Sequence, residues 1–377
     1  MSKRSHSLEI ERKSRTKEAG SSKKEMQMTK EGAGNQKRRI INYDVLNIVC
    51  ILVVVLMHHN TLVHSYSNTA AWKQALVVEN AFYFTVPCFF MLSGAKLMRY
   101  RDRYDTKTFL KKRISKVMIP YFFWGTVIII LRELIGRSVL TSFSLRGILD
   151  AYFNHRFAGT YYFFPAIVTL YLLLPVLSHL AYRRKTLWYI AGTIFVFQSF
   201  LPMLAAMAGI EWTAGWESGI TVRAVHLILG YLLSSEMPDK KTRLKIYAVG
   251  AGIELVRFFL ILILSIRQGA EYTVLNSSYY APGVLYAAAA FTFFISMDMS
   301  RIEKNEKLVR VIRTLSGATF GIYMIHNTII MPVLQMVLHL SDESFFWRTG
   351  AFLLTYGISA VIVLVMKKIP VINIFVP

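Results

Sequence analysis

The chain has 377 residues, of which 54% are hydrophobic and only 18% are charged. A typical soluble domain carries about 25% charged residues, so soluble enzymes, secreted disulfide scaffolds and disordered regulators are excluded. The net charge of +22 would suit nucleic acid, but the Lys and Arg residues lie between long apolar runs, which indicates membrane topology instead.

The first 39 residues are polar and rich in Lys and Arg. They show no apolar periodicity and contain too little apolar surface to form a core. The sequence therefore predicts a disordered, basic, cytoplasmic tail over residues 1–39 that acts as a topology signal. The alternative interpretation is a tail that adsorbs to anionic lipid headgroups.

Ten apolar segments follow, most of them near the roughly 20 residues that cross a bilayer. They are Ile41–Leu62, Ala75–Met98, Val117–Ile135, Thr160–Leu180, Thr186–Ala208, Thr221–Leu233, Ile246–Ile266, Pro282–Met297, Leu315–Leu340 and Trp347–Met366. Most of the Lys and Arg residues lie on alternate loops, beginning with the tail, as the positive-inside rule requires. We expect an all-α polytopic membrane helix bundle of about ten transmembrane helices, with both termini cytoplasmic and residues 40–377 forming one domain.

Several ionisable side chains lie inside these segments, where they are costly and tend to mark function. They are Asp44, His58, His59, Glu79, His226, Glu254, Arg257 and His326. At 1.5 Å per residue, His58 and Glu79 each lie about 6 Å from the outer ends of their helices. The two side chains are therefore expected to meet, with the carboxylate fixing the imidazole tautomer. The alternative is that either histidine of this helix is a polar side chain that forms a hydrogen bond between helices and has no catalytic role.

Other polar positions favour structural interpretations. His59 points about 100° away from His58 on the same helix, so the two are not expected to face one cavity. Glu254 and Arg257 are three residues apart and can neutralise each other. His226 and His326 are interpreted as interhelical hydrogen-bonding groups, with a substrate path as the alternative. Cys50 and Cys88 lie in apolar segments and indicate neither a disulfide framework nor a metal site.

The order of several short motifs resembles acyltransferase family 3, the bacterial multi-pass membrane enzymes that O-acylate cell-envelope glycans. Residues 43–47 (YDVLN), ten residues and then His58 are similar to that family's first helix. Residues 86–94 (VPCFFMLSG) resemble its second-helix signature, in which Pro87 and Gly94 are interpreted as a kink and a close-packing position. Residues 109–113 (FLKKR), with Lys116, Pro120 and Tyr121, are similar to its basic motif. Weaker similarities follow at residues 161–164 (YYFF), with Tyr171 and Pro175, and at residues 321–326 (GIYMIH).

The resemblance implies transfer of an acyl group, usually acetyl from acetyl-CoA, to a hydroxyl of an envelope glycan or lipid-linked sugar, in a bacterial cell membrane. It implies His58 as the catalytic histidine, and Arg113 and Lys116 as a basic pair needed for activity. The depth argument adds Glu79 as the expected catalytic partner of His58. No bound cofactor or metal is expected. Asn47 stands where the family commonly has Arg, and we expect Lys96 to replace part of that missing charge. Ser93, Tyr323, His326, Glu254 and Arg257 are expected to be structural or to line the pore.

The sequence leaves two alternative functions open. The same buried polar groups would suit a transporter or flippase of a polar envelope precursor, although no internal repeat of the kind that many transporters carry is evident. Asn47 would also suit an inactive membrane partner.

Overall fold

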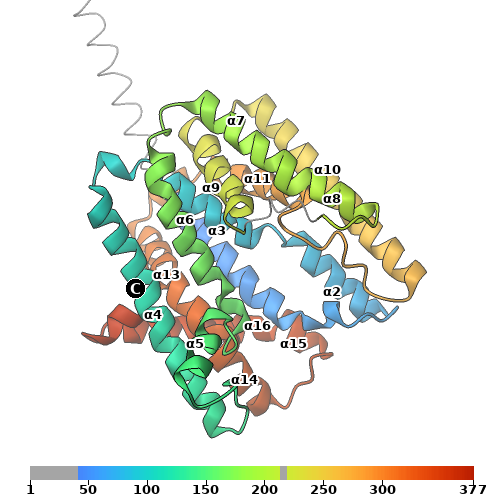
Figure 1. Cartoon of the computed structure of the whole chain (residues 1–377), viewed down its shortest axis with the longest axis vertical. Coiled ribbons are helices and arrows are strands. Elements are labelled where there is room, and N and C mark those ends of the chain that lie inside the picture. Colours follow the sequence, from blue (N-terminus) through green and yellow to red (C-terminus); the bar gives the residue numbers. More distant parts are fainter. Residues whose placement is uncertain (1–40, 213–218) are drawn as a thin grey trace, which may run out of the picture.

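The structure is a computed structural model that describes residues 41–212 and 219–377. The predicted basic tail, residues 1–39, lies outside the described residues. Throughout the described ranges, the regular elements are helices. Figure 1 shows them as a bundle in which segments far apart in the sequence lie side by side.

The elements follow one another in a single series. The first helix spans Ile41–His59. It is followed by η1 (Thr61–His64), α2 (Ala70–Ala81), α3 (Thr85–Leu97), η2 (Tyr100–Asp102), α4 (Thr106–Leu134), α5 (Leu145–Phe153), η3 (Gly159–Tyr162), α6 (Phe163–Ser178), α7 (Arg184–Phe195), η4 (Val196–Phe200) and α8 (Leu201–Met207). After residues 213–218 come α9 (Gly219–Ser235), α10 (Lys240–Gln268), α11 (Ala281–Ser296), α12 (Ser300–Glu303), α13 (Glu306–Ile325), η5 (His326–Ile330), α14 (Met331–Leu338), α15 (Phe345–Thr349), α16 (Ala351–Met366) and η6 (Ile372–Phe375).

The predicted membrane bundle is confirmed. Within the described residues, seven helical stretches are long and apolar enough to cross a membrane. Three shorter apolar helices, Val222–Ser235, Ala281–Ser296 and Ala351–Met366, complete the ten predicted segments. The cytoplasmic placement of both termini stays a prediction.

The second predicted segment consists of two helices instead of one. The chain leaves α2 after Ala81, turns at residues 82–84 and enters α3 at Thr85. Pro87 therefore lies in the first turn of α3, where its missing N–H breaks no intrahelical hydrogen bond. The kink expected at Pro87 is wrong, because the chain bends at residues 82–84.

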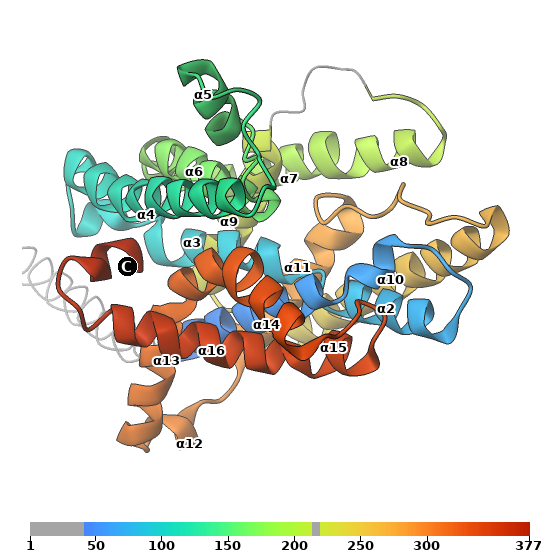
Figure 2. The same cartoon turned by 90° about the horizontal axis from the view of Figure 1, so that it is seen from below.

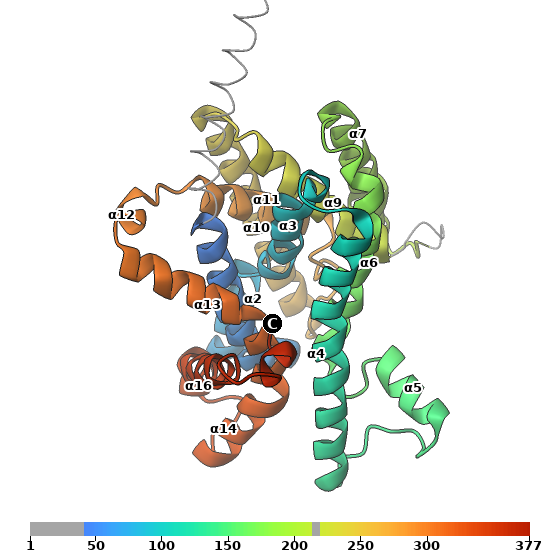
Figure 3. The same cartoon turned by 90° about the vertical axis from the view of Figure 1, so that its left-hand side faces the viewer.

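Closely packed helix pairs hold the bundle together. Helix α3 packs along α9, α10 along α11, α13 against α16, and α4 beside α6. Figure 3 shows α4 running along one flank next to α6, with α5 standing away from the bundle. Figure 2 shows the C-terminal segment beside α4, where Trp124 Nε1 donates a hydrogen bond of 2.9 Å to the Phe375 carbonyl.

Two glycines allow α3 and α9 to approach closely. A Cβ at Gly94 would lie 1.8 Å from the Leu227 carbonyl oxygen, and one at Gly230 would lie 2.1 Å from the Met91 oxygen. The obstructing atoms are backbone, so they cannot rotate away. Close approach through small residues is a usual way for membrane helices to associate, and the expected close-packing role of Gly94 is confirmed.

We expect Gly94→Ala to destabilise the protein by about 3 kcal/mol or more, since overpacking at a backbone contact forces the two helices apart. The matched control is Gly252→Ala on α10, where a Cβ meets nothing within 4 Å. Thermal denaturation of the detergent-solubilised variants measures both. Equal melting temperatures for the two variants would contradict this account of the α3–α9 contact.

Candidate active site

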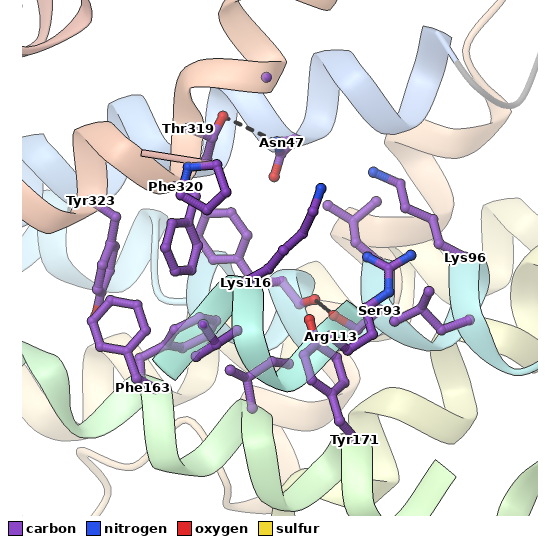
Figure 4. Close-up of a pocket in the computed structure, with 18 of the residues that line it drawn as sticks. Asn47, Ser93, Lys96, Arg113, Lys116, Phe163, Tyr171, Thr319, Phe320 and Tyr323 are labelled. Atoms are coloured by element: carbon purple, nitrogen blue, oxygen red, sulfur yellow. Dashed lines mark hydrogen bonds between the residues drawn. The ribbon is translucent and has the colours of Figure 1, made fainter. Parts of the chain in front are cut away.

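One cavity of about 520 Å³ opens where the first helix, α3, α4, α6 and α13 converge. The C-terminal residues Lys367 and Pro377 complete its wall. Asn47 lies at this end of the first helix, so we call it the Asn47 end of the bundle; the opposite end, where His58 lies, is the His58 end. Figure 4 shows Lys96 and Arg113 at one side of the cavity and Phe163 and Tyr323 at the other.

Four cations face this cavity. Lys96 comes from the last turn of α3, Arg113 and Lys116 share one face of α4, and Lys367 follows α16. In the part of the chain that the structure describes, none of the four forms an ion pair with a carboxylate. Burial and the neighbouring Lys116 charge lower the pKa of Lys367. A concentration of Lys and Arg suits a phosphate ligand.

Local sequence explains why α4 presents Arg113 and Lys116 here. Asp105 caps the helix by accepting a hydrogen bond of 2.9 Å from the Thr108 backbone N–H. From this fixed start, Arg113 and Lys116 lie three residues apart, so their side chains project from one face of the helix. Both positions are predicted donor-site residues, and the structure brings them to the cavity that Lys96 and Asn47 also line.

Asn47 joins the first helix to α13. Its Nδ2 donates hydrogen bonds to the Ser316 carbonyl at 3.1 Å, to Ser316 Oγ at 3.1 Å and to Thr319 Oγ1 at 3.0 Å. Ser316 Oγ in turn donates to Asp44 Oδ1 at 2.8 Å. The Asn47 amide therefore links the first helix to α13 by hydrogen bonds at the wall of the cavity. The negative charge of Asp44 also interacts with Lys96.

Aromatic and hydroxyl side chains line the remaining wall of the cavity. Phe163, Phe164 and Tyr171 come from α6, while Phe320 and Tyr323 come from α13. The Tyr323 hydroxyl donates a hydrogen bond of 2.6 Å to the Thr160 carbonyl. Ser93 Oγ donates to the Phe89 carbonyl at 3.0 Å, which agrees with a structural hydroxyl. The cavity thus combines cations with aromatic side chains, with Lys96 and Arg113 at one side and Phe163 and Tyr323 at the other.

A row of rings continues from Tyr323 toward the His58 end. The centres of the Tyr323 and His326 rings are 5.7 Å apart, and those of His326 and His58 are 5.3 Å apart. His58 is partly exposed, whereas His326 is fully buried. Neither His58 nor His326 lines the cavity. The Tyr323 ring does line it, and the ring contacts connect Tyr323 to His326 and then to His58.

His59 faces away from this row, as its helical position predicts. Its Nδ1 lies 3.1 Å from the Trp347 carbonyl, and its Nε2 lies 2.9 Å from Thr355 Oγ1. The ring also packs against the Trp347 indole at 4.3 Å between centres. His59 therefore ties the first helix to α15 and α16.

The expected pairing of His58 with Glu79 is wrong. Among the described residues, His58 contacts the His326 ring, and Glu79 interacts with Asn60 and with the charges of His64, Arg257 and Glu271. The rise along ideal helices predicts only depth, whereas α2 packs on α10 and places Glu79 near the Arg257 charge of that helix. A catalytic role for Glu79 beside His58 has no structural support.

Glu254 and Arg257 form the predicted ion pair. Arg257 Nη2 lies 2.6 Å from Glu254 Oε1 and Nε lies 2.9 Å from Oε2, with side chains only 1% and 8% exposed. Arg257 also donates to the Leu275 carbonyl at 3.2 Å and covers the Tyr83 ring at 4.4 Å. Neither residue lines the cavity, so the pair is structural.

Sequence reasoning missed Lys367, Ser316 and Thr319 as residues of this site. Lys367 belongs to none of the motifs, and its one signal in the sequence is its position directly after the last apolar segment, at the same predicted end of the bundle as Arg113 and Lys116. Ser316 and Thr319 carry no charge and match no motif by themselves. The expected interhelical hydrogen bonds of His226 and His326 are also wrong. Among the described residues, neither ring nitrogen of His226 has a hydrogen-bond partner, and the hydrogen bonds of His326 stay within its own helix.

Comparison with known proteins adds one finding. A family model described as an acyltransferase domain matches residues 40–365. No curated protein and no solved structure matches the chain. The matched residues include every helix that lines the cavity, together with His58 and His326.

Proposed function

Because this chain belongs to the acyltransferase 3 family of membrane proteins, we propose that it transfers an acyl group from a cytoplasmic acyl-CoA to a hydroxyl of an envelope glycan or lipid-linked sugar. Acetyl-CoA is the proposed donor, and a bacterial cell membrane the proposed location. The observation that carries the proposal is a cavity lined by four cations and by aromatic side chains, with two imidazoles in ring contact beyond its Tyr323 wall.

The chemistry of the donor matches this combination of cations and aromatic side chains. The nucleotide end of acyl-CoA carries phosphates, which Lys96, Arg113, Lys116 and Lys367 would bind. The less polar arm of the donor would lie against the aromatic side chains of α6 and α13. Asn47 and His58 are separated by eleven positions on one helix, about 16 Å along its axis, so a donor that enters at the Asn47 end must extend along the helix to reach the imidazoles.

His58 is the proposed general base. Its free ring nitrogen takes the proton of the acceptor hydroxyl while that oxygen attacks the thioester carbonyl carbon. A C–O bond forms, the C–S bond breaks, and the departing thiolate takes the proton from His58. A transient acyl-imidazole on His58 is an alternative route with the same net balance.

The test is acyl transfer in membranes that contain the protein and receive a radiolabelled acyl-CoA. The proposal expects donor-dependent incorporation of label into envelope glycan or lipid-linked sugar. A transporter or flippase would instead move its substrate without consuming any acyl-CoA. Mass spectrometry of the envelope glycans from cells with and without the gene then identifies the acceptor and the acyl group.

Lys367 gives a sharper test of the donor site. We expect Lys367→Gln to raise the KM for acyl-CoA about tenfold with little change in kcat, because one phosphate-binding cation is removed from ground state and transition state alike. Lys368→Gln is the matched control, since its side chain is exposed and does not line the cavity. Equal KM values for the two variants would remove Lys367 from the donor site.

A further inference from the structure

The tautomer of His326 is fixed by its own helix. Its Nδ1 lies 3.0 Å from the Ile322 carbonyl and 2.9 Å from the Tyr323 carbonyl. Both partners are acceptors only, so Nδ1 must carry the proton. The neutral ring then has an unprotonated Nε2, which can only accept a hydrogen bond.

That acceptor is buried and has no partner. His326 is 0% exposed, and its Nε2 forms no hydrogen bond with any residue that the structure describes. Leaving a buried acceptor unsatisfied is costly, which is why such atoms in native proteins call for an explanation. His326 also begins the π-helical turn η5, a departure from regular helix that is frequent at functional sites.

The neighbour of this ring is His58. The two ring centres are 5.3 Å apart with a tilt of 39°, and two imidazoles joined by an N–H···N bond of about 3 Å have their centres about 5 Å apart. The structure holds the rings at that separation as a tilted contact, and rotation of the partly exposed His58 ring would align the bond. His59, the adjacent histidine, is engaged by Trp347 and Thr355 and does not compete.

We propose that His326 is the positioning residue of His58: its unprotonated Nε2 accepts a hydrogen bond from one ring nitrogen of His58 and leaves the other free as the base. This inference rests on the proposed function. It assigns to a second histidine the role of setting the tautomer of the base, which a carboxylate fills in Ser-His-Asp triads. It also replaces Glu79, which lies in a different cluster.

The experiment compares two substitutions of one residue. In His326→Asn, the side-chain amide can still donate to the Ile322 and Tyr323 carbonyls, but the acceptor facing His58 is lost. In His326→Gln, the longer amide can present an oxygen at that position. We expect kcat to fall about tenfold to a hundredfold in His326→Asn, with the KM for acyl-CoA unchanged, and to recover largely in His326→Gln. In a His58→Ala background, His326→Asn should cause no further loss.

The matched control is His226→Asn on α9. His226 is also 0% exposed, and its ring nitrogens also lack hydrogen-bond partners, so it reports the general cost of replacing a buried histidine. We expect this variant to keep its kcat. Thermal denaturation verifies that each variant is folded.

The outcomes separate the two proposals. Wild-type kcat in His326→Asn, or equal losses in the Asn and Gln variants, would overturn the positioning role while leaving the proposed acyl transfer intact. If the wild-type protein consumes no acyl-CoA, both proposals fail. In the folded wild type, a ¹⁵N-histidine NMR spectrum that assigns the proton of His326 to Nε2 would also overturn the positioning role, independently of activity.

Discussion

His58→Ala is expected to lower kcat for acyl transfer by about 10²- to 10⁴-fold, the range that general bases contribute to enzyme rates. The alanine leaves no group to take the proton of the acceptor hydroxyl. The KM for acyl-CoA should change little, because the cations of the cavity lie about 16 Å away along the first helix. A rate assay at saturating donor, repeated over a range of donor concentrations, separates the two effects.

The control for this substitution is His64→Ala. His64 lies in η1, just beyond the end of the first helix, and its side chain is 61% exposed, with its Nδ1 at 3.8 Å from a Glu271 carboxylate oxygen. The variant should retain wild-type kcat. If His58→Ala reaches the membrane in a folded form and transfers acyl groups at the wild-type rate, His58 is not the base.

The second large effect concerns stability. Glu254→Leu is expected to lower the free energy of unfolding by about 3–5 kcal/mol, because it leaves the guanidinium of Arg257 buried without its counter-ion. Arg257 is 2% exposed, and its remaining contacts, the Leu275 carbonyl and the Tyr83 ring, do not neutralise its charge. The link between α10, the turn before α3 and the segment before α11 would therefore weaken. Thermal denaturation in detergent measures the change.

Two comparisons identify the cause of that loss. Glu236→Gln breaks a surface ion pair in which Glu236 is 69% exposed, and we expect a change below about 1 kcal/mol. The double variant Glu254→Leu with Arg257→Met removes both charges and should recover most of the stability. If the single and double variants are equally unstable, lost packing rather than the unpaired charge is the cause.

Much of the fold could be predicted because the bilayer constrains it so strongly. The ten apolar segments correspond to the seven long and three shorter apolar helices of the described residues. Successive membrane helices run in opposite directions, which explains why Asn47, Lys96, Arg113 and Lys116 come together in one cavity. Residues that begin one helix and end the next lie at one level, whatever the details of packing.

Rotation about the helix axes could not be predicted in the same way. Depth alone put Glu79 level with His58, but the side on which α2 packs decides which residue Glu79 meets. The role of His326 depends on the π-helical turn that starts at this residue, and no spacing in the residues 321–326 indicates such a turn. Lys367 reaches the cavity because of how the chain continues after α16, and the hydropathy pattern contains no information about that path.

The hydrogen bonds by which Asn47 links the first helix to α13 have a mechanical consequence. The first helix carries Asn47 and His58, and α13 carries Ser316 and Thr319 and leads directly into His326. The two imidazoles therefore belong to the same pair of helices that the amide fastens together at the opposite end. We therefore expect a displacement of the first helix or of α13 on ligand binding to be transmitted to the other helix through these hydrogen bonds, which keeps the two rings at the same separation.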